Sequence, residues 1–313
     1  MSLSVRFLGT SASRPTIERN VSSIAIVREG ETFLFDCGEG TQRQMMRYGV
    51  SFALEDIFLT HLHTDHILGV VGLMRTMALQ GRTEPLRLWG PRTAARVMRR
   101  AEQFGADRPS FPLEITELSD GDCVRRKDYQ IEAFDADHGG APALGFTLVE
   151  DERKGRFDPD TARKLGIPEG PLWGQLHRGE PVALQGGNVI ESQAVVGPSR
   201  PGRRVTVSGD TRPSLRTVES ARRADLLVHE ATFGDADAVR AVETGHSTAR
   251  EAATVASQAG VRRLALTHFS ARYSRDTRDL EKEAREVFEN FVVARDGLEL
   301  DIPFATSTLD LGE

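Results

Sequence analysis

Short apolar runs, some alternating with polar residues and each ended by glycine or charged residues, recur along the chain and predict β-strands. The expected strands are Ser4–Leu8, Ser22–Val27, Thr32–Phe35, Asp56–Thr60, Leu86–Trp89, Tyr129–Phe134, Gly145–Val149, Val205–Val207, Leu226–Val228 and Leu264–Leu266. The second and third flank Glu29-Gly30-Glu31, which indicates a hairpin. The run at 56–60 is short and apolar, as expected of a strand covered on both faces.

Segments with helical apolar spacing alternate with these strands. Helices are expected within Gly38–Arg47, which begins as a turn, and at Ile67–Leu79, Thr93–Phe104, Leu215–Arg223, Thr248–Gln258 and Asp279–Val293. We expect Asp65 to cap the second of them, since aspartate satisfies free N–H groups at a helix start. This alternation predicts a layered α/β protein with two sheets and helices outside.

The segment from Glu150 to about Val182 breaks this rhythm because it is polar and rich in glycine and proline. It interrupts two strand-like stretches. A loop of that length within a compact domain is typically functional or disordered. We therefore treat 150–182 as an insertion with its own role.

Composition narrows the class of protein without naming an activity. The chain has 313 residues, 39% of them apolar, and a formal net charge of −6 from 40 Lys and Arg against 46 Asp and Glu. This balance excludes a basic coat over the whole surface, as for general nucleic-acid binding. No apolar run approaches the roughly 20 residues of a membrane span. Two cysteines make no disulfide framework, so we expect a reducing, cytoplasmic location.

The strongest chemical signal is His61-Leu-His63-Thr-Asp65-His66, because three of the eight histidines fall within six positions. Imidazole and carboxylate donors suit zinc. Four donors in so short a stretch exceed what one ion usually takes, which indicates two neighbouring ions. A strand at this point would place His61 and His63 on one side, and a following helix would carry Asp65 and His66.

More candidate ligands follow later strands. They are His138 after Tyr129–Phe134, Asp210 after Val205–Val207, His229 and Glu230 after Leu226–Val228, and His268 after Leu264–Leu266. Because α/β sheets gather their chemistry beyond the carboxyl ends of strands, we expect these side chains to converge. For His229 a structural role is favoured over ligation.

Together these motifs resemble the ribonuclease Z family of the metallo-β-lactamase superfamily. The resemblance extends over nearly the whole chain and rests on the histidine motif, Phe7–Thr10, Phe35–Gln42, Gly170–Gly174, His229–Thr232, Gly245–Thr248 and His268–Tyr273. It implies a metallo-β-lactamase-like αββα sandwich, with two central mixed sheets flanked by helices. Residues 1–313 would form one catalytic domain with a flexible tRNA-binding arm inserted at 150–182.

The resemblance also implies the site. His61, His63 and His138 would hold one Zn²⁺, Asp65, His66 and His268 a second, and Asp210 would bridge them; Mn²⁺ or Fe²⁺ could replace zinc, because ligand type does not fix the metal. Two ions about 3.5–4 Å apart can clamp a phosphodiester. Asp65 would act as the base, and His246, oriented by Glu230, would protonate the departing oxygen.

The expected substrate is a tRNA precursor, cut after the acceptor stem to leave a 3′-hydroxyl on the tRNA and a 5′-phosphate on the trailer. By resemblance, the contacts to RNA would come from Arg19 and Asn20 in the loop 14–20, and from Arg153, Lys154, Arg156, Gly170 and Pro171 in the arm. Ile17 stands where the family often has lysine. The family is commonly a homodimer whose arm serves the partner's active site.

Two other interpretations stay open. A dinuclear phosphodiesterase or sulfatase of the same fold, acting on a small substrate, would share the histidine motif but would not need a remote arm. A non-catalytic RNA-binding module would lack metal. Cleavage of a tRNA bearing a 3′ trailer, and the metal content, separate these alternatives.

Overall fold

The computed structural model describes residues 2–105, 108–184 and 187–305, which divide into two compact units. The first unit comprises the described residues of 2–125, 131–148 and 203–305, and the second comprises 126–130 and 149–202. Each unit has its own apolar core. None of the helices in these ranges has the length and apolar character needed to cross a bilayer.

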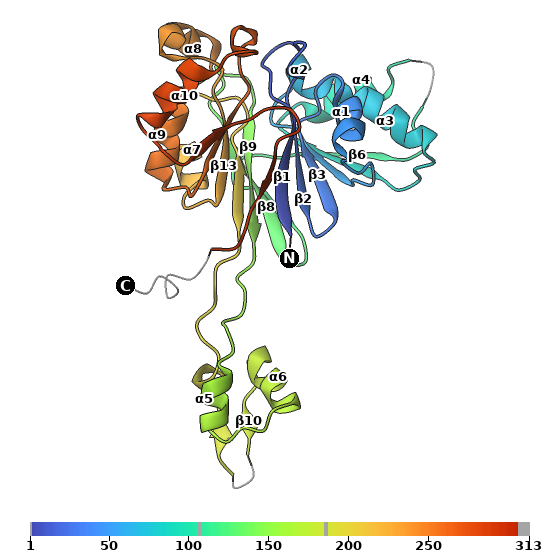
Figure 1. Ribbon diagram of the computed structural model, residues 1–313. Coiled ribbons are helices and arrows are strands. Elements are labelled where there is room, and N and C mark those ends of the chain that lie inside the picture. The colour runs from blue at the N-terminus through green and yellow to red at the C-terminus, as the bar shows by residue number, and fades with distance from the viewer. Residues whose placement is uncertain (1, 106–107, 185–186, 306–313) are drawn as a thin grey trace. The chain divides into compact units, whose positions relative to one another are not determined.

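The first unit is built on two sheets of seven described strands each (Figure 1). One sheet has the order β16-β1-β2-β3-β4-β5-β6. Its strands are β1 (Leu3–Gly9), β2 (Ser23–Arg28), β3 (Glu31–Phe35), β4 (Asp56–Phe58), β5 (Leu86–Gly90), β6 (Leu113–Glu117) and β16 (Glu299–Asp301). Pairing is antiparallel from β16 to β3 and parallel from β3 to β6, so the sheet is mixed.

The other sheet has the order β15-β14-β13-β12-β9-β8-β7. Its strands are β7 (Cys123–Arg125), β8 (Tyr129–Asp135), β9 (Leu144–Glu150), β12 (Arg204–Val207), β13 (Leu226–Glu230), β14 (Leu264–Thr267) and β15 (Phe291–Val293). The run from β12 to β15 is parallel, so the carboxyl ends of β12, β13 and β14 meet at one edge.

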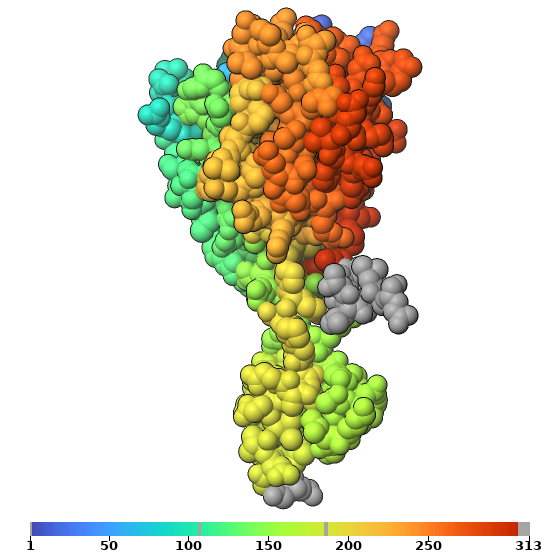
Figure 2. Space-filling view, turned by 90° about the vertical axis from the view of Figure 1, so that its left-hand side faces the viewer, coloured from blue at the N-terminus to red at the C-terminus, as the bar shows by residue number. Residues whose placement is uncertain are grey.

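Helices cover the outer faces of both sheets. The helices α1 (Thr41–Tyr48), α3 (Gly69–Leu79) and α4 (Ala94–Glu102) lie outside the first sheet, and α7 (Leu215–Ser220), α9 (Ala249–Ala259) and α10 (Arg278–Arg285) lie outside the second (Figure 1). Two short helices, α2 (Thr64–Ile67) and α8 (Ala238–Thr244), lie at the edge where the strands end (Figure 1). In Figure 2, orange and red residues of the C-terminal half cover much of the visible face of this unit.

Alternating side chains produce the layers. In β4, Ile57 joins the core beneath the helices, while Phe58 faces the other sheet and contacts Phe146 of β9 with ring centroids 5.3 Å apart. Phe35 of β3 stacks on Phe58 at 5.2 Å. Because successive strand residues point to opposite faces, one short apolar run fills two cores. On the opposite side, the alanines of α9 allow close packing on Leu227 and Leu264.

The second unit contains α5 (Pro159–Lys164), α6 (Pro171–Arg178), the paired strands β10 (Val182–Ala183) and β11 (Val189–Ile190), and a 3₁₀ turn at Ser192–Ala194. Ala162, Ile167, Leu176, Val182 and Val195 form its core. The glycine and proline content of this segment predicts an irregular structure. Pro159 and Pro171 instead occupy first helical positions, where the N–H that proline lacks would have no partner within the helix. The unit also continues beyond 182, to Gly202.

Three local expectations were wrong. Asp65 does not cap the helix at 69–79: it lies within α2, and its carboxylate accepts a hydrogen bond from the Ser13 amide instead. The chain from 279 to 293 is not one helix, because α10 ends at Arg285 and the β-branched and aromatic residues 291–293 form β15. The strand β4 ends at Phe58, so a loop, and not strand alternation, directs His61 and His63.

Candidate metal centre

The chemically reactive side chains follow strands that end at one edge of the sandwich. His61 and His63 follow β4, His138 follows β8, Asp210 follows β12 and His268 follows β14 directly. Glu230 is the last residue of β13, and His246 lies between α8 and α9. The structure therefore brings the seven predicted ligand residues, together with His246 and Glu230, into overlapping groups of three whose ligand atoms lie within 4.8 Å of one another.

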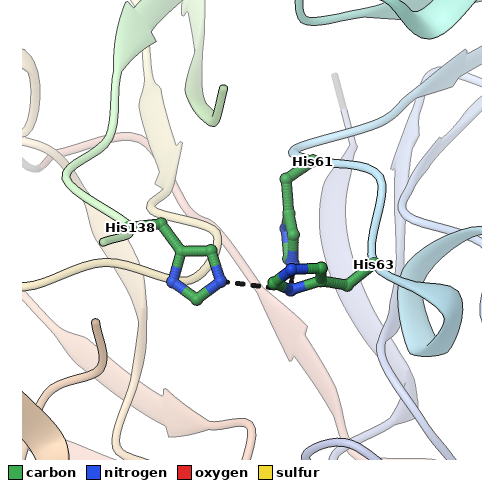
Figure 3. A group of neighbouring side chains, drawn as sticks. All are labelled: His61, His63 and His138. Atoms are coloured by element: carbon green, nitrogen blue, oxygen red, sulfur yellow. Dashed lines mark hydrogen bonds between the residues drawn. The ribbon is translucent and has the colours of Figure 1, made fainter. Parts of the chain in front are cut away.

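His61, His63 and His138 form the first group, shown in Figure 3. His63 Nδ1 lies 3.1 Å from His61 Nε2 and 3.2 Å from His138 Nε2. His61 and His138 are buried, whereas His63 is exposed. The group is thus open to solvent on the His63 side.

Asp65, His66 and His268 form the second group. The Nε2 atoms of His66 and His268 are 3.3 Å apart, and each lies 3.5 Å from Asp65 Oδ2. His268 has a φ of 58°, a left-handed backbone conformation that turns its side chain directly after β14.

Asp210 joins the two groups through one oxygen. Its Oδ2 lies 3.6 Å from His61 Nε2 and 3.3 Å from both His66 Nε2 and His268 Nε2. The side chain is almost fully buried. Such a shared carboxylate oxygen is the arrangement that a bridging ligand requires.

The Nδ1 atoms of four histidines, His61, His66, His138 and His268, are all hydrogen-bonded. His66 Nδ1 donates to Asp36 at 2.7 Å, and His138 Nδ1 donates to the Gly245 carbonyl at 2.8 Å. The Nδ1 atoms of His61 and His268 instead contact threonine hydroxyls that donate their own protons to carboxylates. His61 Nδ1 is 3.1 Å from Thr60 Oγ1, which donates to Asp36, and His268 Nδ1 is 3.0 Å from Thr232 Oγ1, which donates to Glu230.

This accounting fixes the tautomers. Because a hydroxyl that donates to a carboxylate can only accept from a neighbouring imidazole, Nδ1 carries the proton in all four rings. The Nε2 atoms then present lone pairs to one another and to the oxygens of Asp65 and Asp210. Acceptors at such short distances repel unless a cation lies among them, so this donor set fits divalent metal ions.

The electrostatics of His61 and Asp210 agree with that conclusion. Burial and the neighbouring His66 hold the pKa of His61 well below its usual range. Burial opposes ionisation of Asp210, but His268, His66 and His61 outweigh it and hold the pKa of its carboxyl far below normal. Burial also disfavours a charged His66, yet Asp210 and Asp36 raise its pKa well above the ordinary value. A proton and a metal ion therefore compete for His66 Nε2.

A close approach of two glycines joins the His138 and His246 loops. Gly245 has a φ of 71°, and a Cβ there would lie 2.7 Å from the Gly139 amide nitrogen. Only glycine meets both conditions, because a side chain would be strained in the left-handed region and would collide with the neighbouring backbone. The Gly245 carbonyl is thereby placed to orient His138.

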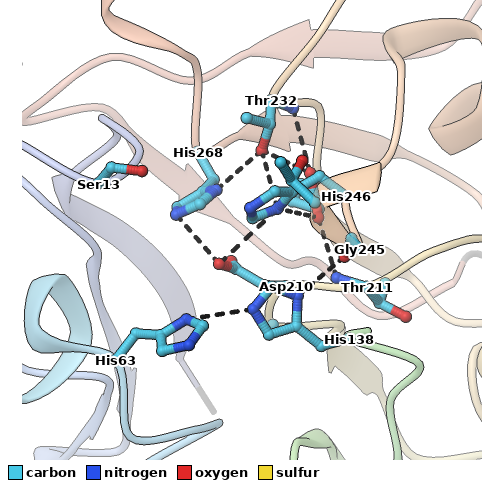
Figure 4. A network of polar contacts seen from close by, with 12 residues as sticks. Ser13, His63, His138, Asp210, Thr211, Thr232, Gly245, His246 and His268 are labelled. Atoms are coloured by element: carbon cyan, nitrogen blue, oxygen red, sulfur yellow. Dashed lines mark hydrogen bonds and ion pairs between the residues drawn. The ribbon is translucent and has the colours of Figure 1, made fainter. Parts of the chain in front are cut away.

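His246 and Glu230 lie beside the metal groups. Figure 4 shows His246 next to Asp210 and His268. His246 Nδ1 donates to Glu230 Oε1 at 2.8 Å, and the same carboxylate accepts from the Thr211 and Thr232 amides. Burial alone would lower the pKa of His246, but the Glu230 carboxylate raises it to about 9. The ring is therefore held in its proton-donating form, with Nε2 free.

A pocket of about 380 Å³ opens onto these groups. His63, His138 and His246 form its reactive wall, while Ser13, Arg14, Phe233 and Arg240 line other sides. Asp65 contacts one of the lining residues, because its Oδ2 accepts from the Ser13 amide at 2.7 Å. The pocket therefore gives a substrate direct access to the candidate acid, and the candidate base lies next to its wall.

Several predicted residues lie outside this cluster. His229 is fully buried in β13 and bonds the Glu230 carbonyl through Nδ1, as a structural role requires. Arg19 turns inward, and its guanidinium donates to Thr10 Oγ1 and to the Ala294 carbonyl. Asn20 bonds the Glu39 carbonyl. These two side chains stabilise the loop 14–20, and Arg14 is the residue of that loop that lines the pocket.

The five predicted contacts in the second unit stay predictions. Lys154 and Arg156 are exposed, Arg153 pairs its backbone with Arg200, and Gly170 and Pro171 begin α6. Sequence reasoning missed Asp36 and Thr232, which fix the ring orientations. Both belong to motifs singled out from the sequence, but only the structure reveals which atoms they contact.

Comparisons with known proteins place this fold and site. Residues 31–194 and 192–269 match the family described as "Beta-lactamase superfamily domain". A Ribonuclease Z of Gemmatimonas aurantiaca is 63% identical over 99% of each chain, and one of Myxococcus xanthus is 52% identical over 96% of this chain and 98% of its own. The crystal structure of the short form of human tRNase Z has a TM-score of 0.70 at 28% identity, covering 96% of this chain and 100% of that one.

Two mixed sheets flanked by helices, with a His/Asp cluster at one edge, define a metal-dependent hydrolase of the metallo-β-lactamase superfamily. Within that class, the identity to curated relatives extends over nearly the full length of both chains. The chain belongs to the ribonuclease Z family.

Proposed function

We propose that this chain is an endoribonuclease that removes the 3′ trailer from tRNA precursors, leaving a 3′-hydroxyl on the tRNA and a 5′-phosphate on the trailer. The observation that carries the proposal is the convergence of all seven expected ligand residues in a chain of the ribonuclease Z family. A small-substrate phosphodiesterase of the same fold would share the cluster, but the identity to ribonuclease Z proteins favours RNA.

Two Zn²⁺ ions per chain suit the donor set. His61, His63 and His138 would hold one, Asp65, His66 and His268 the other, and Asp210 Oδ2 lies within reach of both groups. When bound, such ions neutralise phosphodiester charge and activate a water for in-line attack. Mn²⁺ or Fe²⁺ would accept the same nitrogen and oxygen ligands.

The chain's own residues manage the protons. Asp65 is held by the amide of Ser13, a residue that lines the pocket, and in this proposal its carboxylate orients the attacking water and takes its proton. As the bond from phosphorus to the 3′-oxygen breaks, that oxygen needs a proton. His246 faces the same pocket with Nε2 free and Nδ1 anchored on Glu230, so it is the group positioned to supply one.

RNA recognition away from the cut belongs to the second unit in this proposal, through Arg153, Lys154, Arg156, Gly170 and Pro171. Support comes from the separate apolar core of this unit and from the exposed Lys154 and Arg156. The proposal includes a homodimer in which this unit serves the partner's site. It also includes a cytoplasmic location. Light scattering of the purified protein tests the dimer.

The Asp65→Ala variant tests the mechanism. We expect cleavage of a precursor with a 3′ trailer to fall at least about 10³-fold, since a ligand and the base are lost together. Binding of the precursor should persist, because the contacts away from the cut are intact. Cleavage at a rate near that of the unsubstituted protein would contradict the assignment.

A further inference from the structure

The ion pair between Arg212 and Glu251 contacts the backbone of His246. Arg212 Nη1 donates to the His246 carbonyl at 2.5 Å and to Glu251 Oε2 at 2.7 Å, while Nη2 donates to Glu251 Oε1. The two side chains are 19% and 30% exposed. Two N–H···O bonds between one guanidinium and one carboxylate fix the orientation of the two groups as well as their distance.

Glu251 connects this pair to the start of α9. It is the third residue of the helix and forms a capping box: its Oε2 accepts from the Thr248 amide at 2.9 Å, and Thr248 Oγ1 accepts from the Glu251 amide at 3.2 Å. The first turn of α9 therefore holds Glu251, and Glu251 holds Arg212. Because a helix turn is rigid, the position of the Arg212 guanidinium is set by the helix.

Arg212 also connects His246 to the other reactive loops. The Arg212 amide donates to the Asp137 carbonyl at 2.7 Å, next to His138. The preceding residue, Thr211, donates from its amide to Glu230 and accepts from Ser247 Oγ through its carbonyl. Three segments that are distant in sequence are thus joined at Arg212, one residue beyond this threonine.

His246 is consequently fixed at three points. Glu230 binds its ring through Nδ1, Arg212 binds its main-chain carbonyl, and its amide donates to the Ala241 carbonyl at 2.8 Å. With these contacts in place, Nε2 keeps one direction toward the pocket. Removing the contact to the main chain would leave the ring on Glu230 but allow the loop to move.

We propose that the Arg212–Glu251 pair is a positioning device that sets the reach of His246 toward the departing 3′-oxygen. The proposal rests on His246 being the proton donor in the proposed function. Arg212 itself does not contact the substrate, because the described residues that line the pocket do not include it and both of its terminal nitrogens face Glu251 and the His246 carbonyl.

The test compares leaving groups. A precursor whose scissile 3′-oxygen is replaced by sulfur releases a thiolate, and thiols ionise near pH 8–9, at about pKa 8.5 for cysteine, so this substrate needs no proton donor. For Arg212→Leu we expect single-turnover cleavage of the normal precursor to fall about 10- to 100-fold, part of the roughly 10²–10⁴-fold effect of a general acid. Cleavage of the sulfur-containing precursor should change less than about threefold.

A second variant and a control complete the design. Glu251→Gln keeps the shape of the side chain and should show the same selective loss to a smaller degree, and the double variant should be no worse than Arg212→Leu, because the pair acts as one unit. Arg216→Leu is the matched control, since Arg216 pairs with Asp120 on the surface. It should cleave both substrates like the unsubstituted protein.

Other outcomes overturn the proposal. Equal loss on both substrates would make the pair merely structural, and a loss confined to precursor binding would make Arg212 an RNA contact. His246→Ala, measured in parallel, separates the two hypotheses: full cleavage by that variant would remove the proton-donor assignment on which this inference rests. No cleavage of the precursor by the unsubstituted protein would instead refute the proposed function.

Discussion

At the residue scale, the site depends on side chains that touch no metal position. Asp36 has a φ of 60°, which is costly for a residue with a side chain, and its carboxylate accepts from His66 Nδ1 and from the Thr60 amide. Strain of this kind persists where the surroundings fix it. The contact orients His66 toward the second group and makes Nε2 the free nitrogen.

Replacing Asp36 should therefore weaken metal binding without removing a ligand. We expect Asp36→Ala to lower affinity about 10- to 100-fold, the usual effect of losing a partner of a ligating histidine. Competition with a chromophoric chelator measures this. Asp36→Asn keeps one acceptor oxygen and should lose less; an unchanged affinity in both variants would show that Asp36 does not orient His66.

The proton donor makes a prediction about pH. A histidine whose pKa is raised is charged below that pKa and loses its proton as pH rises through it. Glu230 raises the pKa of His246 to about 9, and divalent ions nearby would push it back down. Precursor cleavage should thus decline on the alkaline side with a midpoint at or below about pH 9. The decline should vanish for the sulfur-containing precursor, and its persistence there would assign it to another group.

At the scale of elements, the positions of strands were predictable and the loops between them were not. Apolar runs such as Leu226–Val228 and Leu264–Leu266 are visible because the buried strands β13 and β14 require them. The edge strand β6 was missed because its exposed residues are polar. The sequence predicts Asp65 as a helix cap because aspartate, whose carboxylate can bind a metal, is also common at helix starts.

The contact between the loops of His138 and His246 is a junction between elements, and Gly245→Ala tests it. The substitution places a Cβ 2.7 Å from the Gly139 nitrogen in a left-handed conformation, so we expect a loss of about 3 kcal/mol or more in the free energy of unfolding, with reduced metal content.

Gly260→Ala is the matched control for that substitution. Gly260 ends α9 with a φ of 62°, and a Cβ there meets nothing within 4 Å. It should cost only the backbone strain, about 1–2 kcal/mol, and leave metal content unchanged. Equal effects of the two substitutions in urea unfolding would show that the close approach of the loops contributes nothing.

At the scale of the whole molecule, the proposed function assigns chemistry to the first unit and RNA recognition to the second. Apolar runs that end at a common edge predicted nine candidate side chains, among them His229 and Glu230. The family resemblance then selected the seven expected ligands. The ion pair of Arg212 and Glu251 was not predictable, since residues 39 positions apart leave no local pattern. The sequence predicts the insertion but not its core, because the apolar residues that form this core are scattered among polar ones.

This division predicts the effect of removing the second unit. Arg153 and Arg200 pair through their backbones at 2.7 and 2.8 Å, so residues 154–199 can be replaced by a short turn at that bridge. Hydrolysis of bis(p-nitrophenyl) phosphate should change less than about threefold, while KM for the precursor should rise about tenfold or more. Equal losses on both substrates would refute a role of this unit in binding RNA.

The most direct test of the account is cleavage of one tRNA precursor by protein stripped of metal and then reloaded, with both new ends mapped. We expect no cleavage by the stripped protein and recovery with Zn²⁺ or Mn²⁺. The cut should be a single one after the acceptor stem, with a 3′-hydroxyl on the tRNA and a 5′-phosphate on the trailer. Cleavage that persists without metal, or reloaded protein that leaves the precursor intact, would contradict the central claim.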